Sequence, residues 1–184
     1  GLALVGDFND WLPDKNYLAH TEWSFTNIGG GNWELFVPVE RIKEEDLFKW
    51  MVQFSTGEWG ERIPAYATTC VQDRQTKLFS AQIDFSKREY EWKHKFSREI
   101  TSPLIYEVHI GMSSEQETVS TFNEFRENVL PRVIEDGYNV LQIMALQEHP
   151  YYGSFGYQVS NFFALSSRFG TPAEFKNLVD EAHA

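Results

Sequence analysis

The feature of this 184-residue chain that most constrains its fold is a change in hydrophobic periodicity near Ile100. Before that point, short stretches of alternating apolar and polar residues are separated by clusters of Gly, Asn, Asp and Pro. Trp50 and Val52 are expected on one face of a strand and Lys49 on the other, because side chains alternate in direction along a strand. The pattern is typical of a small antiparallel sandwich. We therefore predict an all-β, immunoglobulin-like sandwich over residues 1–99.

The second part of the chain alternates between strand and helix patterns. A buried-strand pattern over residues 104–110 precedes a capping box at Thr121, which should start a helix that Pro131 bends. A second buried strand over residues 138–146 is followed, after a long connection, by a capping box at Thr171. Two successive strand–helix units imply parallel strands joined by a right-handed crossover.

Either a doubly wound sheet or a (β/α)8 barrel satisfies this order of elements. Neither strand leads into a Gly-rich phosphate loop, which counts against the nucleotide-binding version of the wound sheet. The connection over residues 147–170 is long and aromatic, and barrel enzymes keep their sites on loops at this end of the strands. We predict that residues 100–184 form the first two β/α units of a (β/α)8 TIM barrel. The chain is then expected to be a fragment of a longer protein.

Charge and composition exclude several classes of function. The chain has 27 acidic and 16 basic residues and a net charge of −11, which argues against binding to nucleic acid or to an anionic membrane surface. A hydrophobic fraction of 42% is enough for a folded core. The single cysteine, Cys70, cannot form an internal disulfide, and no apolar run is long enough for a membrane span. A cytoplasmic protein is predicted.

The aromatic connection is the segment richest in possible binding groups. Its tyrosine and phenylalanine rings, set among small polar residues, suit a pocket for sugar rings, which offer flat apolar faces and hydrogen-bonding edges. The same residues could instead form a packed loop over the core. The residue pattern alone leaves both interpretations open.

Four segments resemble a known enzyme family. Residues 156–164 (Gly-Tyr-Gln-Val-Ser-Asn-Phe-Phe-Ala) and 166–172 (Ser-Ser-Arg-Phe-Gly-Thr-Pro) are similar to the stretch before the first catalytic motif of the 1,4-α-glucan branching enzymes of glycoside hydrolase family 13. Residues 105–111 resemble the first barrel strand of that family. Residues 4–11 resemble the opening of its sandwich, a carbohydrate-binding module of family 48. The resemblance implies an enzyme that cuts α-1,4 glucan chains and reattaches them through α-1,6 bonds, without a cofactor.

The resemblance also implies particular binding residues. Tyr157 matches the tyrosine that stacks on the sugar beside the scissile bond, and Gln158 would be a neighbouring polar wall residue. Trp11, Lys49 and Trp59 match positions that hold glycan in the sandwich module. The implied partner is an α-glucan such as glycogen or starch. Packing within the protein is the alternative role for each aromatic side chain.

The catalytic acids of the family come from later barrel strands, so the resemblance implies none in this chain. A retaining mechanism needs two carboxylates, and the chain alone is therefore predicted to be inactive. Glu107, Glu148 and Asp180 are not assigned to catalysis, and Glu148 is interpreted as a solvated or structural carboxylate. We expect His109 to be a strand residue with its hydrogen bonds satisfied, and no spacing resembles a metal site.

Two other functions remain open at this point. One is an α-1,6-glucan debranching hydrolase of the same family, which would release linear chains where a branching enzyme adds α-1,6 linkages. The other is a glycan-binding module without catalysis, against which the strand–helix pattern of the second part counts.

Overall fold

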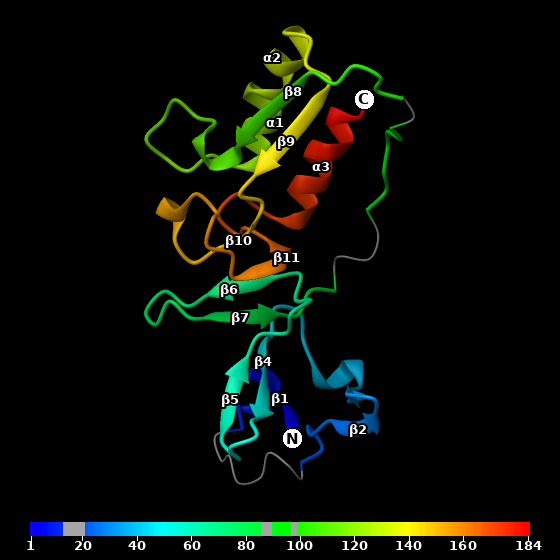
Figure 1. Cartoon of the computed structure of the whole chain (residues 1–184), viewed down its shortest axis with the longest axis vertical. Helices are drawn as coiled ribbons and strands as arrows, with labels where there is room; N and C mark the ends of the chain where they lie inside the picture. The colour runs from blue at the N-terminus through cyan, green and yellow to red at the C-terminus, as the bar shows by residue number, and fades with distance from the viewer. Residues whose placement is uncertain (13–20, 86–89, 97–98) are drawn as a thin grey trace. The chain divides into compact units, whose positions relative to one another are not determined.

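A computed structural model of the chain describes residues 1–12, 21–85, 90–96 and 99–184. Strands are more numerous than helices, and the chain divides into two compact units, Gly1–Phe85 and Ser86–Ala184 (Figure 1). Each unit has its own sheet and its own core.

The first unit is built on a five-stranded antiparallel sheet with the strand order β1-β4-β7-β6, in which β5 also pairs with β4. Its strands are β1 (Leu2–Gly6), β4 (Leu47–Gln53), β5 (Trp59–Arg62), β6 (Cys70–Gln72) and β7 (Phe79–Gln82). A separate hairpin joins β2 (Thr26–Gly29) to β3 (Asn32–Glu34), and single 3-10 turns cover η1 (Asp7–Asn9) and η3 (Val39–Arg41). This antiparallel unit agrees with the predicted β-rich first part of the chain.

Strand β4 is the centre of that sheet, because β1 lies on one side of it and β5 and β7 lie on the other. Ala3 pairs with Met51 and Val5 with Lys49, so these side chains project to the same face. Ala3, Val5 and Met51 form a buried cluster there. The predicted alternation along β4 is therefore confirmed. The face that carries Lys49 contains this cluster, and the opposite face, where Ala81 pairs with Phe48, carries the buried Cys70, Phe79 and Ala81.

The second unit contains one parallel pair of strands. β8 (Ile105–His109) pairs with β9 (Val140–Met144), and the helices α1 (Phe122–Asn128) and α2 (Leu130–Glu135) connect them. The segments that follow are β10 (Gln147–Glu148), η6 (Tyr152–Ser154), β11 (Asn161–Leu165) and α3 (Pro172–Ala182), and the turn η5 (Ile110–Met112) directly follows β8. The predicted order strand, helix, strand, helix is present.

Local sequence signals fix the ends of these helices. The side chain of Thr121 accepts a hydrogen bond from the backbone N–H of Glu124, and that of Thr171 accepts one from the N–H of Glu174. Each glutamate carboxylate in turn accepts a bond from the backbone N–H of its threonine. Both capping boxes are as predicted. In place of one helix bent at Pro131, the structure has two: α1 ends at Asn128 and α2 begins at Leu130, because the ring and missing N–H of Pro131 interrupt the preceding turn.

All three helices pack against one face of the parallel pair. The core contains residues from β8, from each helix and from the segment before α3: Val108, Ile110, Phe122, Phe125, Leu130, Phe169 and Leu178. Glu107 and Ile105, which alternate with the buried Val108 and half-buried Tyr106, are exposed on the opposite face. None of the described helices is both long and apolar enough to cross a membrane.

The division between the units falls before Ile100, where the sequence pattern changes. Asp180 of α3 is only 2% exposed and accepts hydrogen bonds from the backbone N–H groups of Lys93 and His94 and from the hydroxyl of Tyr90. These bonds attach residues 90–94 to the second unit. Burial alone would raise the pKa of Asp180, but the bonds from His94, Lys93 and Tyr90 hold it below its usual value.

Replacement of Asp180 by asparagine should lower the stability of the second unit near neutral pH, because an amide cannot accept from all of these donors. Since the folded pKa is lowered, the carboxylate stabilises the fold above the ordinary Asp pKa of about 3.9, and that contribution is lost as the pH falls through the folded value. In urea unfolding, Asp180→Asn should therefore have a lower free energy of unfolding than the wild type at about pH 7, and the two values should converge in acid.

The exposed Asp136, at the end of α2, provides the matched control, and Asp136→Asn should change little at either pH. Equal losses from Asp136→Asn and Asp180→Asn would contradict the anchoring role of Asp180.

Candidate functional site

The connection after β9 is organised around a short antiparallel pair. Gln147 of β10 pairs with Leu165 of β11, and Glu148 pairs with Asn161, with a shift of register between the two pairs. Residues 149–160 leave this pair and return to it, and we call them the aromatic loop. The residue pattern predicts a site in this connection but not its two strands.

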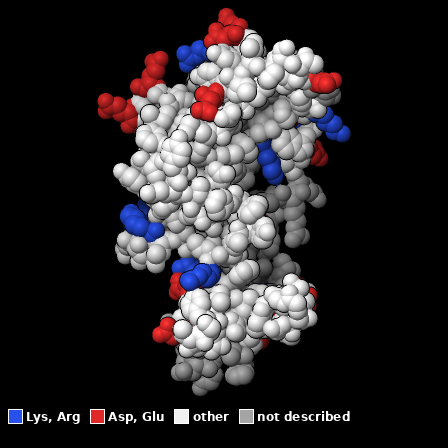
Figure 2. Space-filling view, viewed as in Figure 1, with Lys and Arg blue, Asp and Glu red and all other residues white. Residues whose placement is uncertain are grey.

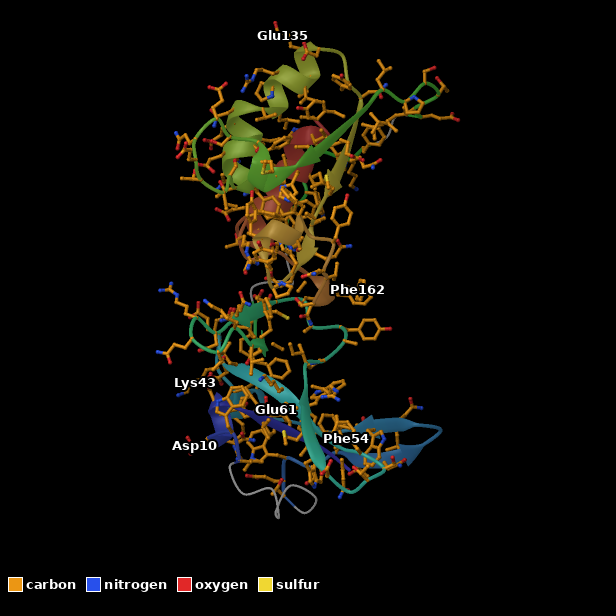
Figure 3. All side chains as sticks on the ribbon, turned by 60° about the vertical axis from the view of Figure 1, so that its left-hand side comes forward. Asp10, Lys43, Phe54, Glu61, Glu135 and Phe162 are labelled. Atoms are coloured by element: carbon orange, nitrogen blue, oxygen red, sulfur yellow. The ribbon has the colours of Figure 1, made fainter. Side chains whose placement is uncertain are left out.

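The aromatic loop and β11 expose five rings, which we call the aromatic surface: Tyr151, Phe155, Tyr157, Phe162 and Phe163. Tyr157 is the most exposed of them, at 83%. Figure 3 shows Phe162 projecting away from the ribbon of β11. On the face of the second unit seen in Figure 2, charged side chains gather near α2 and are sparse near β10 and β11. Exposed rings with few neighbouring charges indicate a binding surface.

Tyr157 is placed by the backbone on its N-terminal side. Its N–H donates to the carbonyl of Ser154 at 3.0 Å. Phe155 and Gly156 both have left-handed backbone conformations, with φ of 52° and 79°. A Cβ on Gly156 would lie 2.5 Å from the Cβ of Ala145, so only glycine lets the loop approach the end of β9 this closely. The neighbouring Gln158 is also exposed.

Glu148 lies at the base of the aromatic loop and is fully buried. Its carboxylate accepts hydrogen bonds from the N–H of His149 at 3.0 Å and from the N–H of Ser167 at 2.9 Å. The guanidinium of Arg168 lies 3.4 Å from the same carboxylate. Of the two roles expected for Glu148, solvated or structural, the structural one is correct.

A cluster of rings packs against the aromatic loop on its protein side. His109 is 8% exposed, and its ring lies 5.9 Å from that of Tyr152, 5.8 Å from that of Phe155 and 5.5 Å from that of Phe169, measured between centroids. Among the described residues, neither ring nitrogen of His109 has a hydrogen-bond partner, so the expectation of a satisfied histidine is wrong. Burial and the neighbouring His149 lower the pKa of His109, which keeps it neutral and lets it pack as a flat ring.

The other two acids considered in the sequence also make structural contacts. Glu107 of β8 accepts a hydrogen bond from Gln142, the residue opposite it on β9, and Asp180 anchors residues 90–94. Among the residues that the structure describes, no three His, Cys, Asp or Glu side chains form a group that could hold a metal ion.

In the first unit, the three residues singled out for glycan binding lie together. Trp11 and Trp59 both pack against the cluster formed by Ala3, Val5 and Met51. The ammonium of Lys49 lies 6.0 Å from the centroid of the Trp11 ring. Both indoles are half-buried, so each keeps part of its surface accessible.

The polar groups of this trio have partners that the sequence analysis missed. Lys49 is only 9% exposed and its Nζ lies 2.6 Å from Oε2 of Glu61, the β5 residue labelled in Figure 3. The Nε1 of Trp11 donates to Asp7 at 2.8 Å. Asp7 lies only four residues before Trp11, whereas Glu61 lies on the neighbouring strand β5, opposite Met51 and so on the face of Lys49.

The close approach of the aromatic loop to β9 gives a test by substitution. Gly156→Ala should destabilise the second unit by about 1–2 kcal/mol for the left-handed backbone and by about 1–3 kcal/mol more for the overlap with Ala145. Gly137→Ala is the matched control, because Gly137 has a φ of 85° but open space around its Cβ position. Urea unfolding should show the larger loss for Gly156→Ala, and equal losses would refute the close approach.

The chain is similar to known proteins along almost its whole length. No family model matches the chain. The chain is 40% identical to the 1,4-α-glucan-branching enzyme of Dictyostelium discoideum and 39% identical to that of Yarrowia lipolytica, in each case over 98% of this chain and 26% of the relative. It is 36% identical to the enzyme of that name from Felis catus, over 100% of this chain and again 26% of the relative.

Two solved structures share the fold. One is a protein from Salmonella typhimurium assigned as an α-amylase, with a TM-score of 0.67 and 18% identity over 99% of this chain and 27% of that one. The other is the GBS pullulanase SAP in complex with maltotetraose, with a TM-score of 0.73 and 15% identity over 99% of this chain and 28% of that one. The chain is thus similar, along almost its whole length, to proteins named 1,4-α-glucan-branching enzyme, and it spans about a quarter of their length.

Proposed function

We propose that this chain is the amino-terminal, glucan-binding part of a 1,4-α-glucan branching enzyme. The whole protein would cut an α-1,4 glucan chain and transfer the cut piece to form an α-1,6 branch. The observation that carries the proposal is an identity of 36–40% along the entire chain to proteins of that name. The aromatic surface and the Trp11–Lys49–Trp59 trio supply two places where such a glucan could bind.

We further propose that β8, β9 and the helices after them are the first two β/α units of a (β/α)8 barrel, and that the first unit is the immunoglobulin-like sandwich that precedes it. The parallel pairing with helices on one face supports this. An apolar groove of about 450 Å³ beside β9 is lined by Leu141, Ile143, Phe175 and Val179 among others. A third β/α unit would cover this groove, and the exposed face of β8 and β9 would become the barrel interior.

The proposed reaction needs a nucleophilic carboxylate and a second carboxyl group that protonates the leaving oxygen. Glu148 and Asp180 are occupied in structural hydrogen bonds, and we place the reacting acids outside this chain. Tyr157 would stack on a glucosyl ring and Gln158 would contribute a polar edge, on a loop that follows the carboxyl end of a parallel strand.

The acidic surface of the chain suits a neutral polysaccharide better than nucleic acid or an anionic membrane. The proposal includes a cytoplasmic location for the whole protein. A debranching hydrolase is less well supported, since the curated relatives named above are branching enzymes and the likeness to a pullulanase concerns the fold alone. The second unit, with its parallel strands, counts against a purely binding module.

The proposal is tested by product analysis of the full-length protein that carries this chain. Incubation with amylose should introduce α-1,6 linkages, detectable by their anomeric proton signals. Tyr157→Ala should reduce this rate at least tenfold, because the stacked ring would be lost, while Tyr157→Phe should keep most of the rate. The chain alone should make no such linkages.

Release of linear chains without new α-1,6 linkages would favour the debranching alternative. If a folded Tyr157→Ala protein kept the wild-type rate, Tyr157 would not belong to the substrate-binding site.

The proposed sandwich site has its own test. Trp11→Ala or Trp59→Ala should raise the Kd of the chain for maltoheptaose about fivefold, which corresponds to about 1 kcal/mol for one stacking ring. Trp33→Ala is the control, because Trp33 is a partly exposed tryptophan on β3 outside the trio. Isothermal titration calorimetry gives each Kd, and equal effects at Trp33 and Trp11 would count against a defined site.

A further inference from the structure

The buried polar cluster at the base of the aromatic loop has no part in the proposed chemistry, yet it contains the one fully buried carboxylate of the second unit among the residues described. We infer that Glu148 and Arg168 are positioning residues: their side chains hold the start of the aromatic loop against the segment that follows β11 and so present Tyr157 to a glucan. The inference rests on the proposed function.

The carboxylate of Glu148 joins segments that are distant in sequence. One oxygen accepts from the N–H of His149, the first residue of the aromatic loop, at 3.0 Å. The other oxygen accepts from the N–H of Ser167, beyond β11, at 2.9 Å. A single side chain therefore holds the segment before the loop against the segment that follows β11.

Arg168, which follows β11, also contacts the start of the aromatic loop. Its guanidinium donates to the carbonyl of His149 and, at 3.0 Å, to the carbonyl of Pro150, while Nη1 lies 3.4 Å from Glu148. The planar fork of arginine can reach several acceptors at once, which the single ammonium of a lysine does less well. The first two residues of the aromatic loop are thus fixed by side-chain contacts.

The last residue of the loop is held at the same point. The backbone carbonyl of Glu148 accepts from the N–H of Ser160 at 2.8 Å and from its hydroxyl at 3.0 Å. Both ends of the loop therefore meet at Glu148. The part between them is held near its tip by bonds within the loop itself, from Ser154 to Tyr151 and from Tyr157 to Ser154.

The energetics favour a positioning role over a purely stabilising one. A buried ion pair contributes little net stability compared with apolar packing, but loss of one partner leaves an uncompensated buried charge. What the pair does supply is order in a loop whose rings are exposed. A loop that is ordered before the sugar binds pays less conformational entropy on binding, and this increases affinity.

The test uses the full-length protein and the variants Glu148→Gln, Arg168→Met and Arg168→Lys. Amide hydrogen exchange over residues 150–160 should become at least tenfold faster in Arg168→Met, with unchanged exchange in β8 and β9. The KM for amylose should rise about tenfold, and kcat should change less. Arg168→Lys should fall between wild type and Arg168→Met in both measurements.

Two controls isolate the pair. Arg126→Met removes the ion pairs of an arginine on α1 with Glu127 and Glu181, and it should leave loop exchange and KM unchanged. The double variant Glu148→Gln/Arg168→Met should show no faster loop exchange and no higher KM than the more affected single variant, because the two residues act as one unit.

Faster exchange throughout β8 and β9, or a loosened loop with an unchanged KM, would overturn the inference. If Glu148→Gln fails to fold, Arg168→Lys still gives the comparison. A wild-type protein that makes no α-1,6 linkages would refute the proposed function instead, and the exchange measurements would still decide whether the pair orders the loop.

Discussion

A carboxylate removed from water must obtain its hydrogen bonds from the protein, and in the second unit this requirement decides the path of the chain. Glu148 satisfies it with two backbone N–H groups and the guanidinium of Arg168. These donors come from opposite ends of the connection between β9 and α3. The connection is therefore drawn into a short antiparallel pair, and Phe169 beyond it is placed in the core. The aromatic loop is what remains outside.

This arrangement accounts for the exposed rings of the aromatic loop. Large apolar side chains at a surface cost solubility and are retained mainly where they bind something. Here the rings follow the carboxyl end of β9, as binding loops do in parallel α/β folds, and His109 and Phe169 support them from below. Tyr157 combines the greatest exposure with a backbone fixed by Gly156. A stacked sugar ring would fit that geometry, which is the basis of the proposed glucan site.

Local features of the fold could be predicted from the sequence, whereas long-range polar contacts could not. The capping boxes at Thr121 and Thr171, a disturbance of the helix at Pro131 and the faces of β4 follow from patterns only a few residues long. The roles of Glu148 and Asp180 depend on partners about twenty and about ninety residues away, for which no periodic signal exists. The same reason explains why residues 90–94 belong with α3 despite a sequence pattern that changes only at Ile100. His109 is the expected strand residue, but its ring packs among other rings and has no hydrogen-bond partner among the described residues.

The most direct measurement of the central claim is a crystal structure of the full-length protein with a bound maltooligosaccharide. The account predicts a glucosyl ring stacked on the face of Tyr157, with the Glu148–Arg168 pair intact beneath the loop. A sugar bound elsewhere, with Tyr157 packed into protein and closed to solvent, would contradict it.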